Sequence, residues 1–152
     1  MHAEAGQTAD FDVAARTSLR LGIAYGQNMW LNIPGDLMRV RATDLRHLAR
    51  QVAAVRSEHP GCDVLADINV AIAGDARSAR SALEKRTDLP ADNTLLYVGT
   101  PVGLAGLVAD LYALHITDGA VLIPLLGRET LELIRNEVVP ELQTFLPVPR
   151  TR

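Results

Sequence analysis

The chain has 152 residues, of which 48% are hydrophobic and 22% are charged, so it is long enough to bury the core of one ordinary domain. Its formal net charge is −3, and no cluster of basic residues alternates with aromatic ones, which argues against nucleic-acid binding. The single cysteine, Cys62, excludes an internal disulfide. The polar start of the chain has no signal-peptide pattern, and we expect a cytoplasmic protein that does not contact membranes.

The first 42 residues are weakly patterned, and we expect an irregular N-terminal segment there. Asp10 is placed to cap a short helix over residues 11–19. The apolar stretch 21–33, which glycines interrupt, predicts strand pieces over 22–25 and 29–33, followed by a turn and a further short element over 37–40. Tyr25 and Trp30 could stack on a ring system, although packing in a core or an interface is the commoner role of such residues.

From residue 43 the chain alternates helical and strand patterns. Thr43 is expected to cap a helix whose apolar stripe includes Leu45, Leu48, Val52 and Val55 and which ends before Pro60-Gly61. Residues 63–73 are rich in valine, isoleucine and leucine, as a buried parallel strand is. The turn at Gly74-Asp75 then leads into a second helix, with Ala76, Ala79, Ala82 and Leu83 facing inward.

The most informative segment is Tyr97-Val98-Gly99-Thr100-Pro101, which joins an apolar strand over 94–98 to a helix. Gly99 supplies the turn, Thr100 is a good N-cap, and Pro101 suits the first helical turn. The helix carries an apolar stripe of Leu104, Leu107, Val108 and Leu111. Another apolar strand follows over 119–125, so this part of the chain predicts a strand–helix–strand unit.

The last helix is expected over residues 128–145, and Pro140 should kink or split it. Its inward residues are predicted to be Leu131, Ile134, Val138 and Leu142. The whole pattern predicts one α/β domain with parallel strands near 64–72, 94–98 and 119–125 and helices on one side. An open parallel sheet and a partial barrel are both compatible with this β/α core over residues 43–146.

No self-contained catalytic constellation is visible, and no histidine or cysteine pair has metal-ligand spacing. Asp63 and Asp67 could perform general acid–base chemistry, but a strand acid paired with an arginine is the commoner arrangement. A helix N-terminus behind a turn such as Gly99-Thr100 can hold a phosphate. A capped structural helix is the alternative interpretation.

Several segments, in this order, resemble the C-terminal end of the luciferase-like flavin-dependent monooxygenases, and more narrowly the branch that contains alkanesulfonate and nitrilotriacetate monooxygenases. They are residues 97–101, 103–111, Asp118-Gly119 with Leu122 and Pro124, and 138–142. The start of the chain fits as well. Residues 5–8 resemble the Ala-Gly-x-Ser segment of that branch, and residues 12–17 resemble its following Ala-Ala-Arg helix.

The resemblance implies part of a (β/α)8 barrel, which typically needs about 250 residues, so the chain would hold the last third to half of one. A fragment, a shortened product and a half-barrel completed by a partner all remain open. In the family, reduced flavin mononucleotide (FMN) and oxygen oxygenate a small organic substrate, while related members use the deazaflavin F420 with hydride chemistry.

Carried over residue by residue, Gly6, Gln7 and Thr8 match the Ala-Gly-x-Ser segment, with threonine in place of serine, and are expected at the flavin phosphate. Gly99 and Thr100 match a second glycine-containing turn, where a structural role is equally expected. Catalytic residues stay unassigned, because the family's early-strand substrate pocket has no counterpart here. No metal site is implied.

The alternative to an oxidoreductase is a non-catalytic flavin-binding or self-association module derived from that family. Three core strands cannot close a barrel, and an open sheet edge with an apolar inner face is rarely left uncovered. We therefore expect a homodimer that uses the edge near residues 21–33, or a partner that supplies the missing half.

Overall fold

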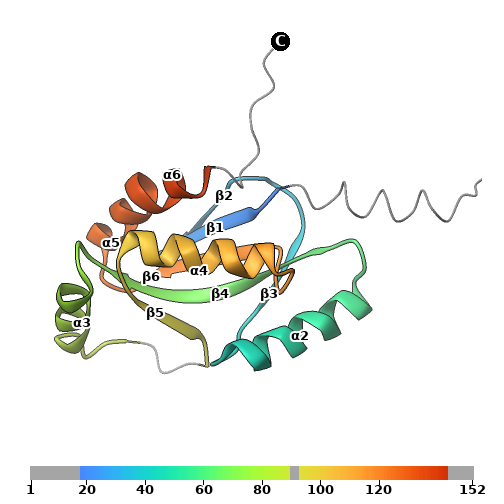
Figure 1. Ribbon diagram of the computed structural model, residues 1–152, viewed down its shortest axis with the longest axis horizontal. Helices are drawn as coiled ribbons and strands as arrows, with labels where there is room; N and C mark the ends of the chain where they lie inside the picture. Colours follow the sequence, from blue (N-terminus) through green and yellow to red (C-terminus); the bar gives the residue numbers. More distant parts are fainter. Residues whose placement is uncertain (1–17, 90–92, 144–152) are drawn as a thin grey trace, which may run out of the picture.

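In the computed structural model, which describes residues 18–89 and 93–143, helices pack on one mixed sheet (Figure 1). The strands within those residues are β1 (Arg20–Tyr25), β2 (Asn28–Leu31), β3 (Leu37–Val40), β4 (Asp63–Ile72), β5 (Leu95–Gly99) and β6 (Gly119–Pro124). The helical segments are α2 (Leu45–Glu58), α3 (Ala76–Glu84), α4 (Pro101–Ala113), α5 (Arg128–Leu133), η1 (Ile134–Val138) and α6 (Val139–Glu141).

The ten-residue strand β4 is the centre of the sheet. β6 pairs with it along one side, while β3 pairs with residues 63–66 and β5 with residues 68–72. All four strands run parallel, which confirms the three predicted strands and their direction. β1 is parallel to β6 on its other side, and β2 completes the edge as the antiparallel arm of a hairpin.

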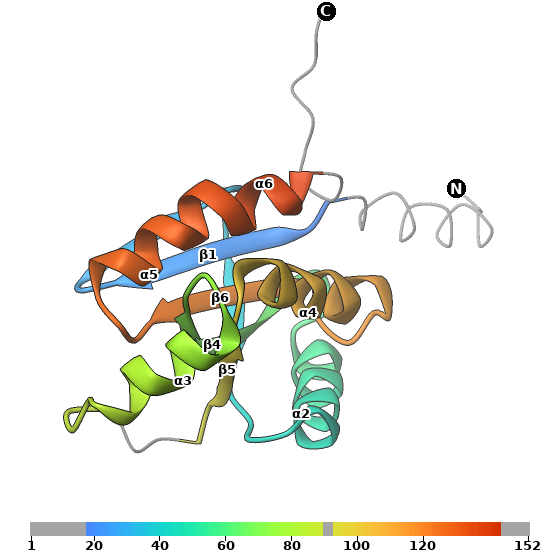
Figure 2. The ribbon, with the colours of Figure 1, turned by 60° about the vertical axis from the view of Figure 1, so that its left-hand side comes forward.

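The strand order is β2-β1-β6-β4-β3, with β5 also on β4. Consecutive strands of a complete β/α barrel are neighbours, but here β6 rather than β5 lies between β4 and β1. The sheet is a curled half-barrel without the sequential order of a whole barrel (Figures 1 and 2).

Alternate residues of β4 separate the two faces of the sheet. Val64, Ala66, Ile68, Val70 and Ile72 join the core cluster, together with the buried side chains of α2 and α4. The opposite face, which we call the polar face, carries Arg20, Arg39, Asp67 and Asn69. Four β4 residues on that face are at most 5% exposed, namely Leu65, Asp67, Asn69 and Ala71.

Helix α4 packs on the core as predicted, with one correction. Leu104, Val108 and Leu111 are buried, but Leu107 is only partly buried and Ala105 is buried instead. The apolar stripe is therefore turned slightly toward Ala105. Figure 1 shows α4 lying across the front of the sheet, where it contacts β6 and β5.

Aspartates cap the first two described helices. The carboxylate of Asp44, rather than the predicted Thr43 hydroxyl, accepts a hydrogen bond of 2.8 Å from the His47 N–H. Asp44 stands directly before the first helical residue, so its side chain reaches the third helical N–H. Asp75 does the same for α3 and accepts from Ser78 N at 2.7 Å.

The C-terminal helix is not split at Pro140 but is widened before it. Residues 134–138 form a π-helical turn between α5 and α6. Because proline has no N–H to donate to the preceding turn, a local change of hydrogen-bond register there is physically expected. The predicted inward residues Ile134, Val138 and Leu142 are buried, and Leu131 is partly buried.

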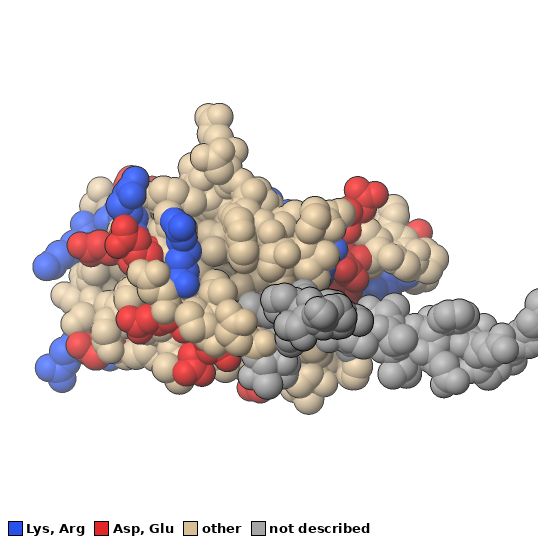
Figure 3. Space-filling model, turned by 90° about the horizontal axis from the view of Figure 1, so that it is seen from above, with Lys and Arg blue, Asp and Glu red and all other residues tan. Residues whose placement is uncertain are grey.

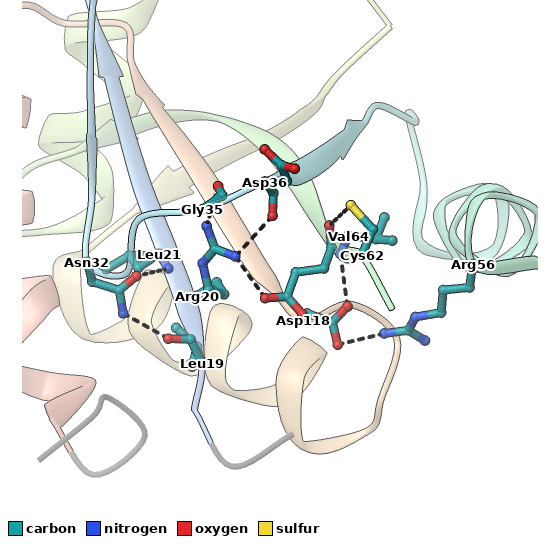
Figure 4. Close-up of polar contacts among 11 residues, drawn as sticks. Leu19, Arg20, Leu21, Asn32, Gly35, Asp36, Arg56, Cys62, Val64 and Asp118 are labelled. Atoms are coloured by element: carbon teal, nitrogen blue, oxygen red, sulfur yellow. Dashed lines mark hydrogen bonds and ion pairs between the residues drawn. The ribbon is translucent and has the colours of Figure 1, made fainter. Parts of the chain in front are cut away.

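The described part of the segment 1–42 differs from the irregular segment that we predicted. It contributes β1, β2 and β3 to the same sheet as β4, so residue 43 does not mark a structural division. The strand pieces predicted within 21–33 are β1 and β2. The hairpin base is fixed by Asn32, whose side chain accepts from Leu21 N and donates to Leu19 O (Figure 4). The helix predicted over 11–19 lies almost wholly outside the described residues.

Candidate functional site

The carboxyl ends of β4, β5 and β6 meet at one edge of the sheet. Ile72 is paired with Gly99, and Val70 with Pro124, so these three strands finish at nearly the same level. In parallel α/β sheets this is the edge at which ligands bind. The predicted residues Gly99 and Thr100 lie there.

The hydrogen bonds of the Gly99-Thr100 turn cap the start of α4. The Thr100 hydroxyl accepts from Gly103 N at 3.2 Å, and the Thr100 carbonyl accepts from Leu104 N at 3.0 Å. Pro101 follows at the first helical position, where it has no N–H to leave unsatisfied. The predicted N-cap and first turn of α4 are confirmed.

The phenol of Tyr97 fills the space beside this turn. A Cβ atom added to Gly99 would lie 2.6 Å from the Tyr97 hydroxyl oxygen, and one added to Gly103 would overlap the same oxygen. A larger residue at either glycine would therefore force the Tyr97 side chain to shift. The start of α4 is filled by Tyr97 and Thr100 and forms no open cradle for a phosphate.

The other predicted cofactor residues, Gly6, Gln7 and Thr8, lie outside the described residues. Of the five residues, the structure describes only Gly99 and Thr100, and the hydrogen bonds of Thr100 cap α4. Contact of any of the five residues with a flavin stays a prediction.

A hollow of about 520 Å³ opens beside the end of β4, between α3 and the C-terminal helix. Its lining includes Gly74, Arg86, Glu129, Thr130 and Glu137. Thr130 is fully buried, and within the described part of the chain its hydroxyl has no hydrogen-bond partner. Figure 3 shows charged side chains toward both ends of the molecule in that view, with an uncharged expanse between them.

Arg86, which lines this hollow, is fixed by contacts with two residues. Its guanidinium pairs with the Asp88 carboxylate at 3.0 and 3.1 Å and donates to Leu125 O at 2.9 Å. The hydrogen bonds from Arg86 hold the pKa of Asp88 below its usual value. The pair ties the end of α3 to the end of β6.

The polar face has its charged groups toward the amino ends of the strands. Arg20 is 5% exposed; it pairs with Asp63 at 2.8 Å and donates to the carbonyls of Gly35 and Asp36 (Figure 4). Its Nε atom is buried and has no hydrogen-bond partner among the residues that the structure describes. Next to this residue the chain requires Gly119, because a Cβ there would overlap the Arg20 carbonyl.

Asp67 is held by arginine, as the simpler of our two interpretations predicts. It is 2% exposed and lies 2.8 Å from Arg39 Nε and 3.6 Å from Arg41 Nε. Asp118 makes a similar link, since it accepts from Val64 N and from Arg56 (Figure 4). Asp118 thus joins β4 to α2 at the end of the sheet opposite to the ligand-binding edge, whereas Asp67 joins β4 to β3 in the middle of the sheet.

Tyr25 and Trp30 line a groove of about 510 Å³ between the β1–β2 hairpin and the C-terminal helix. We call it the aromatic groove; its other lining residues include Asn28, Leu131, Arg135 and Val139. Trp30 is 46% exposed, so it is not a core residue. No sequence signal pointed to Arg135, which is one of several arginines on exposed helix positions.

Within residues 18–89 and 93–143, no group of three or more metal-binding side chains lies close enough to hold an ion. The same residues contain no helix long and apolar enough to cross a membrane.

No known protein family and no curated protein matches the chain by sequence. Solved structures with a similar fold include EDTA monooxygenase (EmoA) from Chelativorans sp. BNC1, at 18% identity over 74% of this chain with a TM-score of 0.58. Long-chain alkane monooxygenase (LadA) matches at 16% identity over 80% of the chain, with a TM-score of 0.55. Riboflavin lyase (RcaE), solved with modified FMN and riboflavin, matches at 17% identity over 80%, with a TM-score of 0.60.

The likeness is one of fold. The chain spans 41%, 40% and 42% of those three structures, in the same order, so it corresponds to about two fifths of each. Two of them are named monooxygenases, and the third was solved with a flavin. The shared fold agrees with the partial barrel that the resemblance in the sequence implies.

Proposed function

We propose that the chain is the C-terminal part of a luciferase-like, flavin-dependent oxidoreductase that acts on a small organic substrate. The observation that carries the proposal is the unit β5–α4–β6. It bears the family's segments 97–101, 103–111 and 118–124 in the family's order, inside a fold shared with flavin-associated enzymes. FMN is the proposed cofactor and coenzyme F420 the alternative.

In this proposal Gly6, Gln7 and Thr8 contact the flavin phosphate, with a contribution from Gly99 and Thr100. The bound flavin would supply the redox chemistry, and the chain would hold it at the carboxyl ends of the strands. The side chains of Tyr97 and Thr100 fill the start of α4. The Gly99-Thr100 turn therefore has a secondary role in this proposal, in which it shapes the edge of the sheet beside the phosphate.

Titration of the purified chain with FMN, riboflavin and F420, followed by flavin fluorescence, tests the proposal. We expect quenching by the protein to be stronger for FMN than for riboflavin, because only FMN carries the phosphate. Thr8→Val should weaken the binding of FMN and leave the affinity for riboflavin unchanged. Thr43→Val is the matched control and should change neither. Absence of quenching at high micromolar concentrations of all three flavins would refute flavin binding by this chain.

Self-association is the second candidate, and the edge strand β2 favours it. Met29 and Trp30 on this strand are 39% and 46% exposed, and an unpaired edge with large apolar side chains invites pairing. The polar face of β4, in contrast, is already buried within the chain. A homodimer in light scattering at micromolar concentration, lost in Trp30→Lys, would support this candidate, and a 16.4 kDa monomer would refute it.

A further inference from the structure

The aromatic groove combines groups that recognise a particular kind of small molecule. One wall is the β1–β2 hairpin, which supplies the rings of Tyr25 and Trp30 and the amide of Asn28. The other wall is the C-terminal helix, which supplies Arg135. These residues come from opposite ends of the described chain.

Arg135 carries its charge on an exposed position of the C-terminal helix. It makes no ion pair or hydrogen bond with the residues that the structure describes, unlike Arg20, Arg39, Arg56 and Arg86. A guanidinium on an exposed helix position keeps its five donors available for a planar anion. A carboxylate is the group that it binds in a two-pronged geometry.

Trp30 and Tyr25 offer apolar ring surface beside that charge. Trp30 pairs with Ile23 in the hairpin, which places it on the same face of the sheet as the helices. Trp30 is 46% exposed, and it lines the groove. The groove volume of about 510 Å³ lies within the range of small-molecule sites, which are mostly apolar with a few placed polar groups.

From these observations we infer that the aromatic groove binds a small aromatic carboxylate. Its ring packs against Trp30 and Tyr25, its carboxylate accepts hydrogen bonds from Arg135, and Asn28 supplies a further polar contact. None of Trp30, Tyr25, Asn28 and Arg135 lies in a segment that resembles the flavin family, so the ligand contacts stand or fall independently of the proposed function.

The tryptophan makes a direct test possible, because Trp30 is the only one in the chain. We choose 4-nitrobenzoate as the probe and 4-nitrobenzamide as its neutral match, and follow Trp30 fluorescence during titration of the full chain. We expect saturable quenching, with the carboxylate bound about five- to tenfold more tightly than the amide at low salt. The difference should shrink as salt is added.

Arg135→Gln should remove the preference for the carboxylate, whereas the matched variant Arg128→Gln, on the same helix but outside the groove lining, should keep it. Urea unfolding of both variants confirms that the fold is intact. Equal affinity for the two probes, or an unchanged preference in Arg135→Gln, overturns the inference. So does a Trp30 signal that depends on protein concentration without any probe, since a second copy then occupies the groove.

Discussion

Both oxygens of the Asp67 carboxylate accept hydrogen bonds from the Arg39 guanidinium, at 2.8 Å from Nε and 3.1 Å from Nη2. Asp67 lies in the middle of β4 and is 2% exposed, whereas Arg39 lies on β3 and is 35% exposed. The pair fastens the four-residue strand β3 to the long central strand. Arg41, at 3.6 Å and 60% exposed, is a weaker second partner.

Arg39→Ala should therefore destabilise the chain. It leaves a buried carboxylate with only the distant Arg41, and we expect the free energy of unfolding to fall by about 1–3 kcal/mol, which is less than for a fully buried pair. Arg41→Ala is the matched control and should cost less than about 1 kcal/mol. Urea unfolding measures both. Equal losses would show that Asp67 does not depend on the two-pronged contact.

The sequence predicts this contact in kind but not in partner. An acid inside an apolar strand needs a cation, which is why a paired arginine was the simpler interpretation of Asp67. Arg39 lies 28 residues earlier, and nothing local distinguishes it from the other arginines. The position of β6 between β4 and β1 escapes prediction for the same reason, because strand order depends on contacts between distant residues.

The candidate site also has one part that the sequence predicts and one part that it does not. The turn at Gly99-Thr100 is predictable because the cap and the N–H groups that it satisfies lie within four residues. The aromatic groove is not, because Trp30 and Arg135 meet only once the hairpin and the last helix pack on the sheet. The role of Tyr97 beside Gly103 is also a packing result, which a strand pattern alone does not contain.

Leu104→Ala and Leu107→Ala should separate the core face of α4 from its margin. Leu104 is fully buried, so Leu104→Ala should lower the free energy of unfolding by about 2–5 kcal/mol. Leu107 is only partly buried, so its truncation should cost clearly less. Thermal or urea unfolding of the two variants gives the comparison. If Leu107→Ala loses as much stability as Leu104→Ala, then Leu107 lies on the buried face of α4, as the sequence pattern predicts.

Asp75 should make the stability of the chain depend on acid pH. The N–H of Ser78, followed by its hydroxyl, lowers the pKa of Asp75 below its ordinary value of 3.8. The ionised cap thus stabilises the folded state fully above pH 3.8, and this stabilisation is lost as the pH falls through the lower, folded-state pKa.

Asp75→Asn tests this assignment, because asparagine caps a helix about as well but does not titrate. The melting temperature of the variant should stay close to that of the parent at pH 7, and should fall less than that of the parent between pH 5 and pH 3. Parallel melting curves of the two proteins throughout that interval would rule out the cap as the titrating group.

Gly103→Ala and Gly106→Ala form a matched pair on α4 with opposite expected outcomes. Gly106 is exposed and has open space around it, so alanine there should stabilise the helix by about 0.5–1 kcal/mol. At Gly103 the new methyl group would overlap the Tyr97 hydroxyl oxygen. We expect a loss of about 1–3 kcal/mol there, because the partly buried ring of Tyr97, which packs against the core, has to shift to make room.

Tyr97→Phe should rescue Gly103→Ala, because it removes the overlapping oxygen. The double variant should therefore be more stable than the sum of the single changes predicts, and a double-mutant cycle in urea measures the coupling. Tyr97→Phe combined with Gly106→Ala is the control and should show additive effects. If the Tyr97–Gly103 cycle is also additive, the hydroxyl does not occupy the start of α4. That turn would then be open to a phosphate, and direct contact of Gly99 and Thr100 with the flavin phosphate would be favoured over a role in shaping the edge of the sheet.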